Sequence, residues 1–320
     1  MATLGEFELI ERFFTRPARR AALGSGDDCA LLAPAPGMAI AVSCDMLIEG
    51  RHFLSTVAPD RLGHKALAVN LSDLAACGAR PLAFSLALAL PHVDEAFLAG
   101  FATGLFGLAD RHDCEIVGGD TTRGPLTICI TVFGEVAPAA ALLRSGAHAG
   151  DDIHVSGTLG DARLALEVFR GTLSLDERTF ATARRAMELP EPRVALGLAL
   201  HGIATSAIDV SDGLAGDLGH ILRRSGVGAV VVLDDLPRGV ALLGQPPAVQ
   251  RECLLAGGDD YELVFTAPSE RRAEVAEAAA LAGVAVSRIG RIDAGSGLRL
   301  IESDGRVVAA DVASFDHFRA

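Results

Sequence analysis

Residues 114–120 read CEIVGGD and residues 205–213 read TSAIDVSDG, and the two stretches share one pattern. In each, an apolar run of strand-forming residues leads into a turn that combines aspartate with glycine. One stretch lies in each half of the chain. The repetition predicts two units of mixed helix and sheet, each with an acidic turn at the end of a strand.

The segments around these stretches support an α+β fold with two domains, 1–138 and 139–320. In the first domain, apolar periodicity and helix-stop signals predict helices at 5–14, 60–77 and 94–111, and strands at 29–33, 38–43, 82–89, 114–117 and 125–136. In the second, we expect strands at 153–156, 205–210, 229–233 and 260–266, helices through about 188, and a helix at 214–225. The boundary is expected near 137–145, after Pro138.

Composition excludes several classes of protein. The chain has 320 residues, of which 50% are hydrophobic, enough for a sizeable core. Its 41 acidic and 28 basic residues leave no basic surface for nucleic acid. The longest apolar run, 82–90, is too short to cross a membrane, and glutamates precede any signal-like run, so we expect a cytoplasmic protein. The six cysteines form no CxxC pair, which indicates free thiols rather than a zinc site.

Five acidic motifs carry the chemical argument: Asp27 with Asp28, Asp45, Asp73, Asp120, and Asp209 with Asp212. Asp73 is expected on a helix, three residues after Asn70, so these two side chains share a face. Aspartate and glycine are ordinary turn residues. Several carboxylates at buried strand ends, however, would each cost several kcal/mol without a cation. Oxygen ligands without a His/Cys cluster favour Mg²⁺.

Mg²⁺ commonly works with substrate phosphates, yet the sequence has no GxxxxGK[ST] loop and no protein-kinase motif. If ATP binds, its charge must be met by metal, by backbone amides at Gly118-Gly119 and Ser156–Gly160, and by an arginine such as Arg144.

The longer motifs resemble the thiamine-monophosphate kinase family, in the superfamily of aminoimidazole ribonucleotide synthetase and selenophosphate synthetase. They occur in the family's order along nearly the whole chain: GSGDDCALL (24–32), VSCDMLIEGRHF (42–53), KALAVNLSDLAACGARP (65–81), IVGGDTTRGP (116–125), LLRSGAHAGD (142–151), AIDVSDGL (207–214) and GGDDYELVF (257–265). The resemblance implies a two-domain, aminoimidazole-ribonucleotide-synthetase-like fold. Its N-terminal domain would bind ATP and Mg²⁺ and form a homodimer through its β-sheet. Its C-terminal α/β sandwich would close over nucleotide and substrate.

By the same resemblance, the chain would use ATP to convert thiamine monophosphate into thiamine diphosphate. Several Mg²⁺ ions would be bound at Asp28, Ser43, Cys44, Asp45, Asp73, Asp120, Asp209 and Asp212. ATP would contact Gly119, Asp120, Arg144 and Ser211, and the thiamine phosphate would contact His52, Asp259 and Phe315.

Three of these positions depart from the family pattern. Cys44 stands where threonine is common, and since a thiol is a poor Mg²⁺ ligand we expect only its backbone carbonyl to contribute. Asp259 replaces a usual glutamate and is one methylene shorter. Phe315 replaces a larger or hydroxylated aromatic, so it can stack but cannot donate a hydrogen bond.

The reaction needs no acid or base from the protein. A phosphate monoester is largely dianionic near neutrality, because its second pKa is about 6, and direct in-line transfer between phosphates is therefore expected. Two alternatives stay open. One is a sister ATP-dependent synthetase of the same superfamily, and the other is a degenerate, non-catalytic sensor that binds ATP and Mg²⁺, which the changes at Cys44 and Asp259 would favour.

Overall fold

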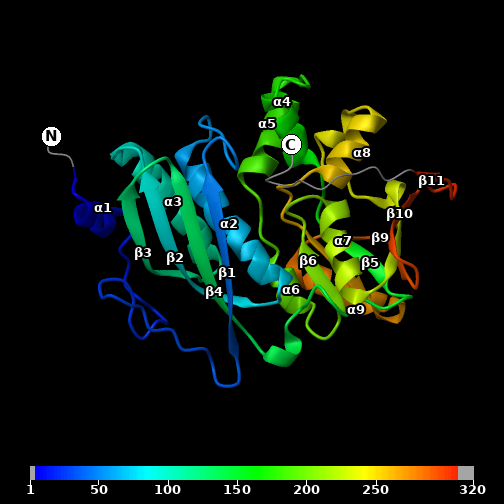
Figure 1. Cartoon of the computed structure of the whole chain (residues 1–320), viewed down its shortest axis with the longest axis horizontal. Coiled ribbons are helices and arrows are strands. Elements are labelled where there is room, and N and C mark those ends of the chain that lie inside the picture. The colour runs from blue at the N-terminus through cyan, green and yellow to red at the C-terminus, as the bar shows by residue number, and fades with distance from the viewer. Residues whose placement is uncertain (1–3, 309–320) are drawn as a thin grey trace. The chain divides into compact units, whose positions relative to one another are not determined.

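The computed structural model describes residues 4–308 and divides into two compact units (Figure 1). One unit holds the chain up to Leu74 together with Ala79–Ala139. The other holds Ala75–Gly78 and the chain from Ala140 onward. Both units contain helices and strands, as the two repeated stretches of the sequence predict. The α+β fold class is therefore confirmed.

The first unit is built on a four-stranded sheet in the order β1-β4-β2-β3. β1 and β2 both run antiparallel to β4, whereas β2 and β3 are parallel. The strands are β1 (Ala39–Ile48), β2 (Arg80–Leu90), β3 (Glu115–Arg123) and β4 (Thr127–Val136). The helices are α1 (Glu6–Phe13), α2 (Pro59–Ala76), α3 (Glu95–Arg111) and the short η1 (Pro138–Ala140). β1 and β3 are consequently the two edges of this sheet.

Helices α2 and α3 pack on each other through glycine. A Cβ atom at Gly63 would lie 2.0 Å from the Phe101 carbonyl oxygen, and one at Gly104 would lie 1.7 Å from the Asp60 carbonyl oxygen. Only glycine permits backbones to approach this closely. One face of strand β1 carries Val42, Met46 and Ile48, which are 59%, 52% and 39% exposed. No described residue of this chain covers that face.

The second unit is built on a seven-stranded sheet in the order β11-β10-β7-β9-β5-β8-β6. Its strands are β5 (Asp152–Ser156), β6 (Ser206–Asp209), β7 (Gly228–Val232), β8 (Leu263–Ala267), β9 (Val286–Asp293), β10 (Gly297–Ile301) and β11 (Val307–Val308). The helices are α4 (Asp161–Phe169), α5 (Glu177–Glu188), α6 (Val194–Ala199), α7 (Leu214–Ser225), α8 (Pro247–Ala256) and α9 (Arg272–Ala282), with short turns η2 (Leu233–Asp235), η3 (Leu242–Gly244) and η4 (Ser269–Arg271). Apolar residues of α4, α7 and α8 form one core with the sheet.

Three local expectations need correction. Residues 29–33 form no extended ladder, only an isolated bridge between Leu23 and Leu31. The strand expected at 38–43 continues to Ile48, so Asp45 lies inside β1. The strand expected at 114–117 runs on to Arg123, so Asp120 lies inside β3 rather than in a turn. In both cases a neighbouring strand, β4 beside β1 and β2 beside β3, pairs with the polar residues and so extends the strand. The propensity of a single segment does not show which strand will pair with it.

Candidate active site

Strand β1 and helix α2 bring together four of the polar side chains singled out above. Ser43 Oγ donates to Asp73 Oδ2 at 2.5 Å, and the Asp45 backbone N–H donates to Asn70 Oδ1 at 3.1 Å. Asn70 is buried and is held in turn by the Ala66 carbonyl, 3.0 Å from its Nδ2. The expected pairing of Asn70 with Asp73 on one helix face is therefore seen, and both side chains face β1.

Cys44 points the other way. Successive side chains of a strand alternate between the two faces of the sheet, and the Cys44 Sγ lies 3.5 Å from Cys129 Sγ of β4. The thiol is thus on the face opposite Ser43 and Asp45. Any contribution of this residue to a ligand on the α2 side has to come from its backbone.

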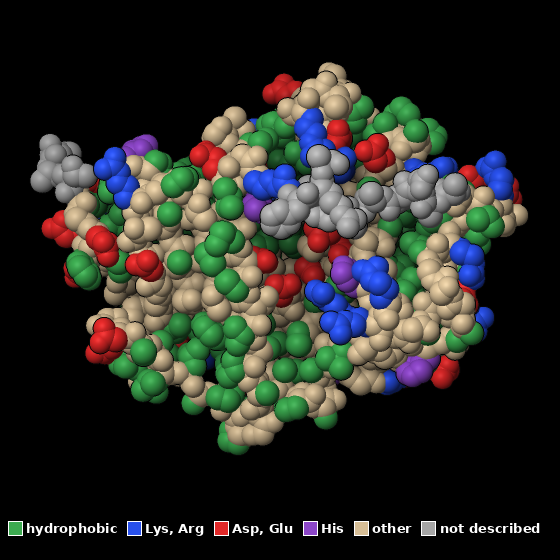
Figure 2. Space-filling view, viewed as in Figure 1, with side chains coloured by type: hydrophobic (Ala, Val, Ile, Leu, Met, Phe, Trp, Pro, Cys, Tyr) green, Lys and Arg blue, Asp and Glu red, His purple; other side chains and the backbone are tan. Residues whose placement is uncertain are grey.

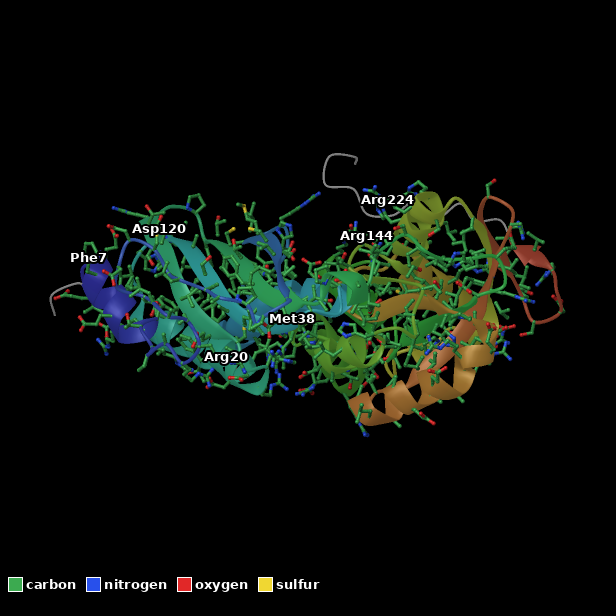
Figure 3. All side chains as sticks on the ribbon, turned by 90° about the horizontal axis from the view of Figure 1, so that it is seen from below. Phe7, Arg20, Met38, Asp120, Arg144 and Arg224 are labelled. Carbon is green, nitrogen blue, oxygen red and sulfur yellow. The ribbon has the colours of Figure 1, made fainter. Side chains whose placement is uncertain are left out.

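Gly119 and Asp120 lie on β3, at the opposite edge of the sheet from Ser43 and Asp45. Gly119 has a φ of +154°, and a Cβ there would lie 1.9 Å from the Leu86 carbonyl oxygen of β2. The strand can follow β2 at this point only with glycine. Asp120 is exposed, and Figure 3 labels it in the first unit. Two intervening strands separate Asp45 from Asp120, roughly 14 Å of sheet.

Asp28 and His52 are also in the first unit. Asp28 is exposed in the loop that precedes β1. His52 follows β1 in a tight turn, in which the Ile48 backbone N–H donates to His52 Nδ1 at 3.0 Å. Because Nδ1 is the acceptor, the proton of the neutral imidazole is on Nε2.

In the second unit, β6 ends at Asp209, which is 4% exposed, and leads into the turn Ser211–Gly213. The backbone N–H groups of Ser211, Asp212 and Gly213 all donate to one oxygen, Asp217 Oδ2, at 3.0, 3.0 and 3.1 Å. Asp217 is 3% exposed. Burial, with a smaller effect of the nearby Asp212 charge, raises the pKa of Asp217 to about 7 despite these hydrogen bonds.

The segment that carries Asp259 is hydrogen-bonded onto the same turn. The Asp259 N–H donates to the Ser211 carbonyl at 3.0 Å, and the Tyr261 N–H donates to the Val210 carbonyl at 2.9 Å. Asp259 and Tyr261 have φ of +67° and +51°, a region that side chains other than glycine rarely adopt. The Tyr261 hydroxyl donates to Asp259 Oδ1 at 3.1 Å. Tyr261 therefore supports the segment that carries Asp259.

Arg144 belongs to a cationic group at the end of α7. Its loop is tied down by the Ala147 N–H, which donates to Ser225 Oγ at 3.2 Å. Burial and the charges of Arg223 and Arg144 lower the pKa of His220, and the Asp212 charge opposes them. The charges of Arg144 and Asp212 therefore both affect the pKa of His220, in opposite directions. Figure 2 shows basic and histidine side chains together over α7, and Figure 3 shows Arg144 and Arg224 on one side of the second unit.

The burial argument for metal binding is wrong for most of the aspartates. Asp28 and Asp120 are exposed, and Asp45, Asp73 and Asp212 are only half-buried, so Asp209 alone is buried. Within residues 4–308, no three Asp, Glu, His or Cys side chains of the chain are grouped as a metal site. Phe315 lies outside the described residues.

Two other carboxylates of the second unit accept hydrogen bonds from backbone N–H groups. Asp161 accepts from the Ala241 and Leu242 N–H groups, and Asp260 accepts from the Gly160 N–H at 2.9 Å. Burial raises the pKa of both carboxyls. Asp217, Asp161 and Asp260 were not singled out as site residues from the sequence. The sequence signal that could have identified them is their position near glycine: Asp217 comes four residues after Gly213, Asp161 directly follows Gly160, and Asp260 lies close to Gly257-Gly258.

Two family models match the chain. AIR synthase related protein, N-terminal domain, matches residues 26–136, and AIR synthase related protein, C-terminal domain, matches residues 148–303. Among curated proteins, the chain is 45% identical to the thiamine-monophosphate kinase of Salmonella typhimurium and 44% identical to that of Escherichia coli K12, in each case over 98% of both chains.

Solved structures agree. Thiamine-monophosphate kinase from Stenotrophomonas maltophilia K279a matches with a TM-score of 0.84 at 44% identity, covering 90% of this chain and 92% of that one. AaThiL complexed with AMPPCP and TMP matches with a TM-score of 0.78 at 30% identity, covering 89% of each chain. The hydrogenase maturation protein HypE of E. coli, at 21% identity and a TM-score of 0.77, shares the fold. The two-domain match and the identity along almost the whole length show that this chain belongs to the thiamine-monophosphate kinase family of AIR synthase related proteins.

Proposed function

We propose that this protein transfers the γ-phosphoryl group of ATP to thiamine monophosphate, giving thiamine diphosphate and ADP. The observation that carries the proposal is the 45% identity to a thiamine-monophosphate kinase over 98% of both chains. AaThiL has been observed with AMPPCP, an analogue of the phosphoryl donor ATP, together with TMP. No helix in residues 4–308 combines the length and hydropathy that a membrane crossing requires. We place the reaction in the cytoplasm.

The donor set fits magnesium. Ser43, Asp45 and Asp73 in the first unit, and Asp209 and Asp212 in the second, offer oxygen atoms only, the ligands that Mg²⁺ prefers. We assign these residues, with Asp28, Asp120 and the backbone of Cys44, to the magnesium ions. When bound, Mg²⁺ would neutralise the phosphates and stabilise the charge of the transition state.

The remaining assignments concern the two substrates. Gly119, Asp120, Arg144 and Ser211 are proposed to contact ATP, and His52, Asp259 and Phe315 the thiamine phosphate. Arg144 is exposed and cationic, which suits contact with a polyphosphate. No general base is proposed, because the attacking phosphate oxygen already carries negative charge near neutral pH.

We further propose a homodimer formed through the sheet of the first unit. Val42, Met46 and Ile48 give β1 an exposed apolar face, and β1 and β3 are unpaired edges in the described chain. Such edges and faces are usually covered by a partner. Joining the β1 edge of one protomer to the β3 edge of the other would also bring Asp45 close to the partner's Asp120. That arrangement accounts for the position of these two ligands on opposite edges.

The decisive experiment is a mass-resolved assay of the purified protein with ATP, Mg²⁺ and thiamine monophosphate. Free thiamine as the acceptor and EDTA in place of metal serve as controls. We expect thiamine diphosphate only when the monophosphate and the metal are both present. ATP binding without any product would instead support the degenerate sensor, and Cys44→Thr combined with Asp259→Glu would then test whether the two departures abolish turnover.

A further inference from the structure

The turn Ser211–Gly213 is organised by a single side chain of α7. Asp217 lies in the first turn of this helix, and its Oδ2 accepts from three consecutive backbone N–H groups at 3.0–3.1 Å. Gly213, at the helix N-cap, provides no side-chain cap of its own. A carboxylate that is 3% exposed therefore fixes the path of the chain from the end of β6 into α7.

Consecutive N–H groups that converge on one point form a concave anion site, the arrangement with which many proteins bind phosphate. Here the anion is the chain's own carboxylate, so these three amides are already engaged. The Ser211 carbonyl is engaged as well, because it accepts from the Asp259 N–H. The hydroxyl of Ser211 is thus the group that this residue can offer to a nucleotide.

We propose that Asp217 is a positioning residue for phosphoryl transfer, which holds the Ser211–Gly213 turn so that the side chains of Ser211 and Asp212 face the magnesium-bound nucleotide. The proposal rests on the proposed function of this turn. Because Asp259 is hydrogen-bonded to the same turn, Asp217 also fixes the segment that carries the proposed substrate contact.

The proposal requires the acceptor oxygen of Asp217 and not its charge. Asparagine retains one side-chain oxygen, which can take the three N–H groups that Oδ2 takes now. Alanine and valine provide no acceptor, so three sheltered N–H groups would be left without a partner, and the turn would rearrange to reach water. Valine refills part of the space that truncation to alanine would vacate, so the two variants together separate the loss of the acceptor from an effect of the cavity alone.

Asp217→Asn, Asp217→Ala and Asp217→Val should be compared with the wild type by calorimetric titration with AMPPCP and Mg²⁺. We expect the Kd of Mg–AMPPCP to rise about tenfold or more in the alanine and valine variants, and to stay within about threefold in the asparagine variant. The matched control is Asp152→Asn. Asp152 is equally buried and accepts from Arg272 Nε at 2.5 Å, but it pairs with Ala267 at the other end of β8 from Asp209. This control should lower Tm without changing the Kd.

The proposal is overturned if folded alanine or valine variants bind Mg–AMPPCP as the wild type does, or if asparagine loses as much affinity as alanine. If neither truncated variant folds, amide hydrogen exchange in the wild type decides: protected amides at 211–213 support the proposal and unprotected ones overturn it. Titration with AMPPCP requires no turnover. A wild type that binds Mg–AMPPCP but forms no thiamine diphosphate would therefore refute the proposed reaction and leave this test valid, whereas a wild type without Mg–AMPPCP binding would overturn the role of Asp217.

Discussion

Two neighbouring residues of the first unit have different roles, one in folding and one in the proposed chemistry. Gly119 and Asp120 are neighbours on β3, yet the glycine is required by the close approach of β2, and the aspartate is exposed. Substitution of the first should change folding, and substitution of the second should change chemistry. Two predictions at the residue scale use this difference.

Asp120→Asn keeps the size and exposure of the side chain but removes its charge. If Asp120 is a magnesium ligand, we expect turnover to fall by about 100-fold or more, because one ligand of the charge-neutralising metal is weakened. Tm should stay within about 2 °C of the wild type, as is usual for an exposed position. Full activity at saturating Mg²⁺, measured as thiamine diphosphate formed per minute, would refute the assignment.

Gly119→Ala should destabilise the first unit. The new Cβ would lie 1.9 Å from the Leu86 carbonyl oxygen, so β3 has to move away from β2. We expect a loss of about 2–4 kcal/mol in the free energy of unfolding, measured by urea denaturation. Gly118→Ala is the matched control, since a Cβ there meets nothing within 4 Å. Equal stability of the two variants would contradict the prediction.

At the scale of elements, buried polar groups hold the loops of the second unit to its strands. Asp217 and Asp161 accept backbone N–H groups, and Glu262 accepts from Ser156 Oγ at 2.5 Å and Arg193 Nε at 2.6 Å. His154 on β5 is not held in this way. It is 5% exposed, it stacks on Phe265 with 5.2 Å between ring centroids, and its Nε2 has no hydrogen-bond partner among the described residues.

His154 makes the stability of the second unit dependent on pH. Burial, helped by the charges of Arg288 and Arg272 and opposed by Asp152, lowers the pKa of His154 from 6.5 to about 4. Between these values the unfolded chain binds a proton that the folded chain does not, so the free energy of unfolding falls as pH drops from 6.5 to 4, by up to about 3 kcal/mol.

His154→Phe should remove this loss, because phenylalanine can stack on Phe265 and does not titrate. We expect the variant to be at least as stable as the wild type at pH 7, since an unpartnered buried nitrogen is eliminated. The difference in the free energy of unfolding between the variant and the wild type should be larger at pH 5 than at pH 7. Urea denaturation at both pH values measures it, and parallel losses in variant and wild type would argue against a role of His154.

At the scale of the whole molecule, three of the proposed ligands of the first unit lie on the two edges of one sheet, Ser43 and Asp45 on β1 and Asp120 on β3. One protomer cannot bring its own edges together without closing the sheet. A second copy can, since its edges have the same unpaired groups. The proposed homodimer therefore predicts an effect on catalysis as well as on assembly.

Asp45→Asn and Asp120→Asn should each lower turnover by about 100-fold or more as homodimers, yet complement each other when co-expressed. In a hybrid dimer one site receives both substitutions and the other receives neither. With random pairing half of the dimers are hybrids, so about a quarter of wild-type activity should return. Native mass spectrometry verifies that hybrids form. Hybrids without activity would place Asp45 and Asp120 in sites of the same protomer.

The proposed homodimer surface can be tested separately with Met46→Glu. Met46 is 52% exposed in the described chain, and a charge there would be buried by the proposed partner. We expect the variant to sediment as a monomer. Leu281→Glu, at an apolar position of α9 in the second unit that is 83% exposed, is the control and should sediment like the wild type.

The sequence by itself determined the two-unit α+β fold, the family, and the oxygen-rich character of the candidate site, because these depend on local periodicity and on long contiguous motifs such as 65–81 and 257–265. It also predicted α7 at its observed limits, 214–225. Only the tertiary structure showed which aspartates are buried and which strands pair. Strand pairing extends β1 and β3 through Asp45 and Asp120, and packing leaves Asp120 exposed while it buries Asp217. Whether an aspartate is available to a metal or holds a backbone turn depends on which segments surround it. Those segments are distant in sequence, so only the folded chain decides the role of each carboxylate.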